Sequence, residues 1–313
     1  MEVMTALNAS ITCGSHSCDS KNIGEYYATN NIHKPYQSSL VINTEDYHKV
    51  VTKLREFFLS KNFLEVSTQN RLSILAACED PFNVQTFEYA GTTWPLPQTG
   101  QMWLEYEILK NPQPAGYFCL TTSYRFEKEP KQDRHDLIFP LFEFETKGGM
   151  NVLIELEKEL LEYLGYDSAK FMEGDYSDIA KTMDTKELEH EHETRLNSEY
   201  SPTFFLKNFP EFTHPFWNMK RTTGNDESCK VDVILSGQET IGSAERETDK
   251  EIMRHRFDTI MDGAYKEKLY ELFGKERTEA ELEDYLNFTF IERCGGGIGV
   301  TRLMRSMKTE GLL

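Results

Sequence analysis

The spacing of apolar residues after Asn43 predicts a long amphipathic helix. Residues three and four apart share one face of a helix, and Asn is favourable just before the first turn. The run that follows, NFLEVSTQN, predicts a strand. The apolar positions that share one helical face are Tyr47, Val50, Val51, Leu54, Phe57 and Phe58.

Two strand-like runs follow, separated by a charged loop. The first extends from Gly116 to Phe126, the loop reads KEPKQDRHD, and the second run reads LIFPLFEFE. This order predicts an antiparallel hairpin with a long polar connection. Because side chains alternate along a strand, Phe142 and Phe144 face one side of the second strand, and Glu143 and Glu145 face the other.

A glycine-rich run near residue 300 reads CGGGIGVTRLMRSM. Its glycines leave a stretch of backbone without side chains, against which a flat or phosphorylated molecule could lie. Arg302, three residues after the last glycine, adds a planar cation that can stack on a base. The alternative interpretation is a tight packing point between a strand and a helix. The run lacks the residue order of a P-loop and does not open a βαβ unit.

Two acidic segments predict helices and carry much of the net charge of −18. They read NVLIELEKELLEYLGY and TEAELEDYL, and in the second Thr278 and Glu281 have the spacing of a capping box. Binding to nucleic-acid phosphates is driven by basic surfaces. So acidic a chain is therefore a poor candidate for independent, tight nucleic-acid binding.

The length of 313 residues is enough for one sizeable core, and the aromatic content supports a globular chain. Residues 1–40 are rich in Ser, Asn and Thr, which predicts a poorly ordered or irregular segment rather than a signal peptide. No apolar run approaches the ~20 residues that a membrane span needs. A folded domain over residues 41–313 is therefore expected.

The six cysteines are scattered and do not form a disulfide framework. Cys13, His16 and Cys18 could suggest a metal site, but their spacing is irregular. Free thiols in a reducing cytosol are the favoured interpretation, and they place the protein in the cytoplasm.

The hairpin brings together residue types that bind a nucleoside triphosphate. Arg125 and Glu127 share one face of the first strand, Arg134 and His135 lie in the loop, and Phe139 follows. Arginines neutralise phosphate, an aromatic ring stacks on the base, and a carboxylate accepts from an exocyclic amine. A solvated hairpin with its charges facing water is the alternative.

These residues resemble motif 2 of the class II aminoacyl-tRNA synthetases, and GGGIGVTRL resembles motif 3. Between them, VDVILSGQETIGSAERE is similar to the segment that precedes motif 3 in the aspartyl/asparaginyl subgroup. The resemblance extends from about Asp46 to about Met307. It implies an α+β fold in which an antiparallel sheet is flanked by helices, and it makes residues 41–313 a synthetase-like catalytic domain.

The resemblance also implies ATP and Mg²⁺ as ligands. Asp232 and Glu239 match the acidic pair that binds magnesium with ATP, and hard carboxylate oxygens suit that ion. Without the resemblance, these two would be ordinary surface acids. The implied ATP-binding residues are Arg125 at the α-phosphate, which is also the catalytic group, Glu127 at the adenine end, Arg134 and His135 at the outer phosphates, Glu239, and Phe139 and Arg302 on the two faces of the adenine.

An amino-acid pocket is implied in the same way. Leu104 followed by Glu105 resembles asparaginyl enzymes, in which an acid accepts from the side-chain amide, whereas aspartyl enzymes have a lysine at position 104. The string from Glu191 to Glu193 (EHE) is also asparaginyl-like; otherwise it would be a metal cluster or a solvated helix start. The implied amino-acid-binding residues are Glu79 at the amino group, Thr99 in place of the usual serine, Gln101, Glu105, Glu143 at the ammonium and Arg246 at the side chain.

Two departures from the family pattern bear on assembly and on the base site. Gln69 stands where motif 1 has a proline at the dimer interface, so a homodimer is expected but its interface is altered. Ile138 replaces an acid that usually precedes the stacking Phe139. Neither change removes a charge that the implied chemistry needs.

The predicted function is that of an ATP-dependent ligase that activates aspartate or asparagine as the aminoacyl-adenylate. Because the sequence lacks room for an anticodon-binding β-barrel and is acidic, transfer to ammonia or another small amine is favoured, as in an archaeal-type asparagine synthetase. The Leu104–Glu105 pattern fits that substrate awkwardly, since asparagine synthesis starts from aspartate. The alternatives are an asparaginyl- or aspartyl-tRNA ligase and an inactive synthetase-like interaction module.

Overall fold

The computed structural model describes residues 42–69, 72–74, 80–126, 136–224 and 227–313. Nearly all of them belong to one compact unit, made of Asn43–Lys128 and Asp136–Leu313. Glu79, Glu127, Arg134 and His135, for which the sequence predicts ligand contacts, lie outside the described residues. Their roles therefore stay predictions.

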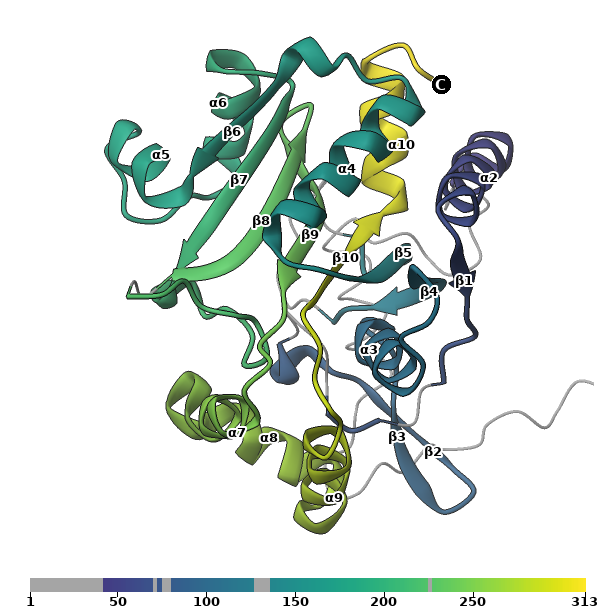
Figure 1. Ribbon diagram of the computed structural model, residues 1–313, viewed down its shortest axis with the longest axis vertical. Helices are drawn as coiled ribbons and strands as arrows, with labels where there is room; N and C mark the ends of the chain where they lie inside the picture. The colour runs from purple at the N-terminus through teal and green to yellow at the C-terminus, as the bar shows by residue number, and fades with distance from the viewer. Residues whose placement is uncertain (1–41, 70–71, 75–79, 127–135, 225–226) are drawn as a thin grey trace, which may run out of the picture. The chain divides into compact units, whose positions relative to one another are not determined.

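An eight-stranded sheet forms the centre of this unit (Figure 1). Its strands pair antiparallel except for β1 with β4 and β6 with β7, which are parallel. The predicted antiparallel sheet flanked by helices is thus confirmed. The strands lie in the order β1 (Phe63–Glu65), β4 (Gly116–Tyr124), β5 (Ile138–Lys147), β10 (Arg293–Gly299), β9 (Gln238–Glu245), β8 (Glu227–Leu235), β7 (Thr203–Pro210) and β6 (Phe171–Asp175), and β2 (Thr86–Tyr89) and β3 (Thr92–Pro95) form a separate pair.

Helices cover both faces of the sheet. One face is packed by α2, α4 and α10, and the other receives α3 against β4 and β5. Below the sheet in Figure 1, α7, α8 and α9 lie together. The helices are α2 (Thr44–Ser60), α3 (Gln101–Lys110), α4 (Met150–Leu164), α5 (Tyr176–Thr182), α6 (His190–Glu199), α7 (Lys250–Thr259), α8 (Ala264–Phe273), α9 (Lys275–Leu286) and α10 (Val300–Thr309).

The predicted helix after Asn43 is confirmed as α2. The Asn43 side chain accepts a hydrogen bond from the backbone N–H of Asp46 (3.0 Å) and caps the first turn. Five of the six predicted apolar positions are buried, and Tyr47 is half-buried. The ring of Phe58 stacks on Phe142 of β5, with ring centroids 5.4 Å apart. The helix is therefore held by its apolar face, as its periodicity predicts.

Two local predictions differ from the structure. The strand after α2 is only Phe63–Glu65, and Gln69 is exposed beyond it. The capping box at Thr278 and Glu281 is wrong, because α9 already begins at Lys275. The Thr278 hydroxyl donates back to the carbonyl of Gly274 (3.0 Å) instead. A helix start one turn earlier converts a capping residue into an internal one.

The predicted hairpin is formed by β4 and β5, which pair antiparallel from Gly116 opposite Thr146 to Tyr124 opposite Ile138. Phe142 and Phe144 are fully buried on the α2 side. Glu143 and Glu145 are also buried, on the α3 side. The alternation of the two faces is as predicted, and at these four positions both faces are buried.

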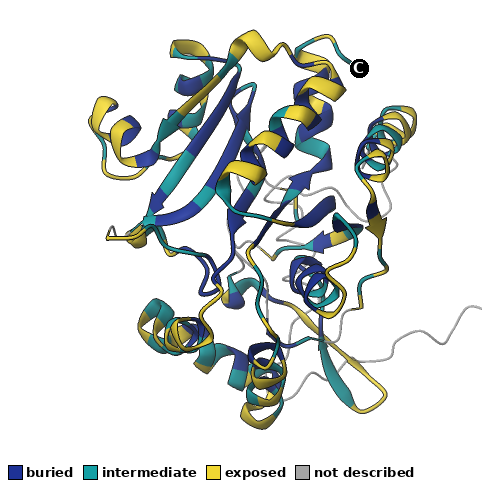
Figure 2. Ribbon diagram, in the orientation of Figure 1, coloured by how far each residue is buried: buried dark blue, intermediate teal, exposed yellow. Residues whose placement is uncertain are grey.

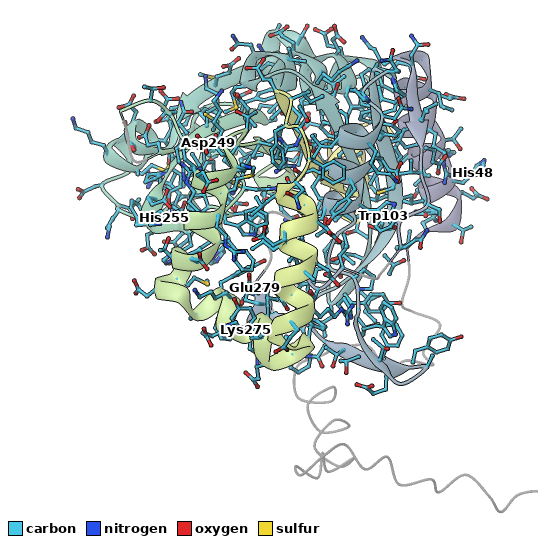
Figure 3. All side chains as sticks on the ribbon, turned by 60° about the horizontal axis from the view of Figure 1, so that its bottom comes forward. His48, Trp103, Asp249, His255, Lys275 and Glu279 are labelled. Carbon is cyan, nitrogen blue, oxygen red and sulfur yellow. The ribbon has the colours of Figure 1, made fainter. Side chains whose placement is uncertain are left out.

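The central strands of the sheet and the outer helices differ in exposure. Figure 2 shows β8, β9 and β10 as almost continuously buried, whereas the outer helices alternate between buried and exposed sides. The surface of α7 and α9 carries ion pairs: Arg254 lies 2.6 Å from Glu279 and 3.4 Å from Glu283. Figure 3 shows Glu279 and Lys275 along α9 and His255 on α7. Charged residues thus lie on the surface of α7 and α9.

Cys119, Cys229 and Cys294 are buried free thiols, in agreement with the prediction for these three positions. In the part of the chain that the structure describes, no helix has the length and apolar character needed to cross a membrane.

Glu157 of α4 is an exception among the buried acids. It is fully buried, and neither carboxylate oxygen has a hydrogen-bond partner among the described residues. The nearby Ser243 hydroxyl donates to the carbonyl of Val231 (3.3 Å). Burial raises the pKa of Glu157 to about 8.

Replacing Glu157 with glutamine should stabilise the protein at alkaline pH. An acid whose pKa rises on folding destabilises the native state once it ionises, so stability should fall as the pH rises towards 8. Glu157→Gln should abolish that loss, a gain on the order of 1–3 kcal/mol above pH 8. Urea unfolding below and above this pH measures it. Glu162→Gln, at an exposed position of α4, is the control, and an equal gain in both variants would contradict the assignment.

Candidate functional site

A row of residues crosses five strands on the α3 face of the sheet. Asp232 of β8 pairs with Gly242 of β9, Gly242 with Gly297 of β10, Gly297 with Glu143 of β5, and Glu143 with Cys119 of β4. Residues paired across strands project to the same face. Two carboxylates therefore flank two residues that have no side chain.

The glycines in this row form an open floor. Gly297 is the one residue of β10 that is not buried, and Gly242 is also half-exposed. A methyl group at position 297 would meet only ordinary contacts, the nearest 3.4 Å away at Leu141. At Gly295, the same methyl group would lie 2.0 Å from the carboxylate of Glu145. The glycine run thus combines both interpretations of the sequence: Gly297 leaves open space, and Gly295 allows close packing.

Asp232 and Glu239 lie at one end of the floor, as predicted, and cations surround them. Lys230 Nζ is 2.7 Å from Asp232 Oδ2, and Arg302 Nη1 is 3.5 Å from Glu239 Oε2 and 2.9 Å from its carbonyl. Burial raises the pKa of Asp232 to about 7, against the effect of Lys230. Arg302, followed by Lys230 and Arg125, outweighs burial at Glu239 and holds its pKa below the usual value.

This pair fits a divalent cation with oxygen ligands. Asp232 Oδ1 is buried and has no hydrogen-bond partner among the described residues. A methyl group built on Gly242 would lie 2.9 Å from Glu239 Oε1 and 3.6 Å from Asp232 Oδ1, so both carboxylates border the space above that glycine. No group of three or more His, Cys, Asp or Glu residues suited to a metal occurs in the described segments. Ligand oxygens would have to complete the shell, as is usual for Mg²⁺.

Arg125 and Phe139 lie together at the open end of the hairpin. The Arg125 guanidinium carbon is 5.6 Å from the centre of the Phe139 ring, and the Arg125 backbone N–H donates to the carbonyl of Leu137 (2.8 Å). Arg302, Lys230 and Arg125 hold the pKa of Glu239 below its usual value, and at Glu143 the charge of Arg125 opposes the rise in pKa that burial causes. Arg125 is therefore within electrostatic reach of both ends of the floor.

Arg302 approaches the same face from the first turn of α10. A methyl group at Gly299 would lie 3.5 Å from its Cδ, and Gly299 pairs with Leu141, two residues along β5 from Phe139. Phe139, Leu141 and Glu143 share one face of β5. The predicted adenine-stacking residues thus come from β5 and from the helix that follows β10, and Phe139 lies on the side of the sheet that carries the floor.

Glu143 is held by the segment that precedes α3. The backbone N–H of Gly100 (2.7 Å) and the hydroxyls of Thr99 and Thr121 (2.9 Å) donate to its carboxylate. Burial raises the pKa of Glu143, although these hydrogen bonds and Arg125 oppose the rise. A fixed buried carboxylate beside an open floor suits a ligand ammonium group.

Arg246 directly follows β9, four residues after Gly242. It is almost fully buried and reaches Glu145 with Nη2 (3.2 Å) and Nε (3.4 Å), and Nη2 also donates to the carbonyl of Gly295 (3.1 Å). Gln101 donates to the same Glu145 carboxylate. Burial raises the pKa of Glu145 to about 7, although Arg246 opposes the rise. Gln101 and Arg246 are thus brought together, as the sequence predicts.

Glu105 is where the structure changes the sequence interpretation. Its Oε2 accepts from Arg293 Nη2 (2.7 Å) and the Tyr285 hydroxyl (2.6 Å), and its Oε1 accepts from the Asn218 amide (2.8 Å). Leu104 is buried in an apolar cluster. Three side chains of the protein therefore already bind the carboxylate that the sequence assigns to a substrate amide.

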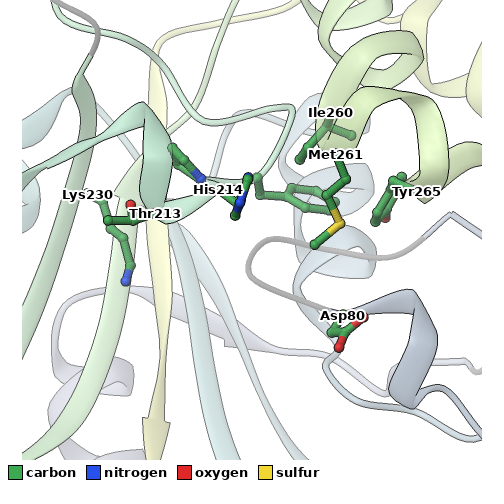
Figure 4. A pocket seen from close by; sticks show the side chains of 9 residues that line it. Asp80, Thr213, His214, Lys230, Ile260, Met261 and Tyr265 are labelled. Atoms are coloured by element: carbon green, nitrogen blue, oxygen red, sulfur yellow. The ribbon is translucent and has the colours of Figure 1, made fainter. Parts of the chain in front are cut away.

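A cavity of about 310 Å³ opens beside Lys230 (Figure 4). Asp80, His214 and Tyr265 are among its lining residues. The backbone of His214 is left-handed, with a φ of 53°, which is uncommon outside glycine. Lys230 therefore faces both this cavity and the acidic pair.

Sequence reasoning missed Lys230, Arg293, Tyr285 and Asn218. Two of these have a signal in the sequence. Lys230 is two residues before Asp232, and Arg293 is two residues before Gly295, so each lies on the same face of its strand as a residue of the site. Asn218 and Tyr285 come from a loop and from α9, and no spacing connects them to Glu105.

The string from Glu191 to Glu193 also has a definite place. His192 Nδ1 accepts from the backbone of Glu189 (2.9 Å) and completes the cap of α6, so it serves the helix start. Glu193 accepts from the backbone N–H of Glu239 (2.9 Å). The string therefore supports the acidic pair from outside the floor.

Comparison with known proteins agrees with the motifs and the fold. Residues 31–310 match the model of a family described as tRNA synthetases class II (D, K and N). No curated protein matches the chain.

Three similar solved structures have related folds. Asparaginyl-tRNA synthetase from Pyrococcus horikoshii, complexed with asparaginyl-adenylate, has a TM-score of 0.68 and 21% identity over 84% of this chain and 64% of its own. The Entamoeba histolytica asparaginyl enzyme with asparaginyl-adenylate has a TM-score of 0.67 and 16% identity, over 85% and 63%. Aspartyl tRNA synthetase from the same organism has a TM-score of 0.63 and 16% identity, over 94% and 64%. The chain spans slightly less than two thirds of the length of each.

Proposed function

Since this chain belongs to the class II tRNA synthetases of the D, K and N group, we propose that it is an ATP-dependent ligase that activates aspartate or asparagine. A carboxylate oxygen of the amino acid would attack the α-phosphorus of ATP, and pyrophosphate would leave. The acyl group would then pass to ammonia or another small amine, with release of AMP and a proton.

The observation that carries this proposal is the side-chain-free floor, which has an acidic pair suited to a metal ion at one end and a single carboxylate suited to an ammonium group at the other. At one end, Asp232 and Glu239 border the space above Gly242. At the other end, three donors hold Glu143, and its carboxylate would bind an ammonium group. A bound aminoacyl-adenylate would place its phosphate near Asp232 and Glu239 and its ammonium near Glu143.

The residues have distinct tasks in this proposal. Arg125 would bind the α-phosphate and stabilise the charge that develops there, while Phe139 and Arg302 would hold the base. Glu143 would orient the amino group, and Gln101 and Arg246 the rest of the amino acid. Asp232 and Glu239 would hold Mg²⁺, which screens the phosphate oxygens when bound. Fixed donors in a buried site need no reorganisation as charge moves.

The inactive interaction module remains the alternative from another class. A copy without activity has no need for Arg125, Asp232, Glu239, Arg246 and Arg302 together. Burying Arg246 and Asp232 also costs desolvation free energy, which a module used only for its surface gains nothing from.

Amino-acid-dependent exchange of pyrophosphate into ATP tests the activity. We expect exchange with aspartate or asparagine, and an amide product when ammonium is added. Binding of ATP without exchange for any of the twenty amino acids would support the inactive module instead.

Transfer to tRNA is the second candidate activity, and charge argues against it. With a net charge of −18, the chain repels phosphate at long range. We expect a Kd for tRNA weaker than about 1 µM at physiological salt. Filter binding with tRNA(Asn) and tRNA(Asp) measures it. Tight binding together with aminoacylation would establish the tRNA ligase in place of the small-amine activity.

A further inference from the structure

We infer that Arg293 is a specificity-determining residue: it binds Glu105 and thereby makes the side-chain pocket accept a carboxylate rather than an amide. This inference rests on the proposed activation of an amino acid and names its substrate as aspartate. It reverses the preference that Leu104 and Glu105 suggest in the sequence.

Arg293 and Glu105 form a closed, dry pair. Both side chains are fully buried, and Arg293 reaches Glu105 Oε2 with Nη2 (2.7 Å) and Nε (3.1 Å). The Tyr285 hydroxyl donates to the same oxygen (2.6 Å) and accepts from Arg293 Nη2 (2.6 Å). The guanidinium lies against the Phe290 ring, 5.0 Å from its centre. Glu105 Oε2 thus has three donors from the protein and no free direction for a substrate amide.

A second pair lies directly beside the first. Arg246 binds Glu145 and also approaches Glu105 Oε1 to 3.6 Å. The two arginines and two glutamates therefore form one network, in which each positive charge has a negative partner. Arg246 donates to the carbonyl of Gly295, two residues along β10 from Gly297 of the glycine floor.

The formal charge of this network sets which side chain it accepts. Without Arg293, the two negative charges of Glu105 and Glu145 would exceed the single positive charge of Arg246. The network would then repel the side-chain carboxylate of aspartate. With Arg293 the sum is zero, so a substrate carboxylate beside Arg246 is not repelled by the network. Burial also raises the pKa of Glu145 to about 7, which reduces the negative charge further. The side-chain amide of asparagine gains less binding free energy, because both glutamates already accept hydrogen bonds from the protein.

A functional reason is needed for this arrangement. Buried ion pairs of this kind are often no more stabilising than apolar residues of similar volume. Four charged side chains in contact, with at most 1% exposure, next to the open floor are typical of a recognition site. Arg293 acts through Glu105 and Arg246, so it is a positioning residue rather than a catalytic one.

A charge series of four proteins tests the inference by the ratio of aspartate to asparagine in pyrophosphate exchange. The wild type should prefer aspartate. Arg293→Gln should shift the ratio towards asparagine by on the order of a hundredfold, the effect of one uncompensated buried charge. Glu105→Gln should shift it further towards aspartate, and the Glu105→Gln/Arg293→Gln double variant should return close to the wild-type ratio.

Two further variants separate charge from folding. Arg293→Lys keeps the charge and loses the two-pronged geometry, so it should keep the preference for aspartate. Arg221→Gln removes an arginine that binds Glu211 and nearby carbonyls outside this network, so it should lower stability without changing the ratio. A wild type that prefers asparagine, or a ratio that is equal in Arg293→Gln and Arg293→Lys, would overturn the inference.

A binding measurement distinguishes this inference from the proposed function. Calorimetric titration of aspartate and asparagine, with a non-hydrolysable ATP analogue present, needs no turnover. If exchange is absent but aspartate binds more tightly and Arg293→Gln reverses the order, the activity is wrong and the specificity stands. If neither amino acid binds, both are wrong.

Discussion

Replacing Arg125 with alanine should reduce the rate of adenylate formation by about a hundredfold to a thousandfold, or roughly 3 to 4 kcal/mol of transition-state stabilisation. Arg125 is fixed by its backbone hydrogen bond to Leu137, and its charge acts on both Glu143 and Glu239. In the proposed function it would bind the α-phosphate, where negative charge develops. Because the ground state carries less of this charge, kcat should fall more than KM rises.

Single-turnover formation of the adenylate measures this effect directly. Arg55→Ala is the matched control: Arg55 also pairs with an acid, Glu65 (2.9 Å), but its side chain is 40% exposed on α2. It should change neither the rate nor the Tm noticeably. Equal rates in Arg125→Ala and the wild type would remove Arg125 from the chemistry.

Substituting alanine at two glycines of β10 should separate stability from activity. At Gly295, the new methyl group would lie 2.0 Å from Glu145 Oε2 and 2.3 Å from the carbonyl of Phe144. A paired backbone carbonyl cannot move aside, so we expect a loss on the order of 3 kcal/mol of folding free energy. At Gly297 the methyl group meets only ordinary contacts, and stability should stay within about 0.5 kcal/mol.

Gly297→Ala should nevertheless lose activity. Its methyl group would project from the open floor and lift a bound adenylate away from Glu143 and Arg125, which we expect to lower kcat/KM by on the order of a hundredfold. Thermal unfolding and pyrophosphate exchange of both variants give the comparison. If Gly297→Ala is fully active, the floor does not contact the ligand.

Periodicity was sufficient for the elements that have one apolar face. The helix after Asn43 and the alternation of Phe142 and Glu143 follow from spacing alone, because burial selects every second position of a strand and every third or fourth of a helix. The floor itself could not be predicted this way. Which residue of β8 lies opposite Gly242 depends on strand order and on a bulge after Val233, and neither has a local signal.

The partners of Glu105 show a second limit. The sequence resemblance identifies the acid but not what binds it, because Asn218, Tyr285 and Arg293 come from three separate segments. Their convergence depends on the packing of α9 beneath the sheet. A resemblance at single positions therefore points to a residue but does not predict which side chains of the protein bind it.

The position of β10 in the sheet also bears on how the protein is made. This strand, late in the sequence, lies between β5 and β9, so the sheet consists of two separate halves until β10 is synthesised. Non-local pairing of this kind slows folding and leaves strand edges exposed during synthesis. During synthesis, β5 and β9 would each have an unpaired edge until β10 is available, and such edges favour non-native pairing. Because Gly297 of the open floor lies on β10, the floor is complete only after this strand has been inserted.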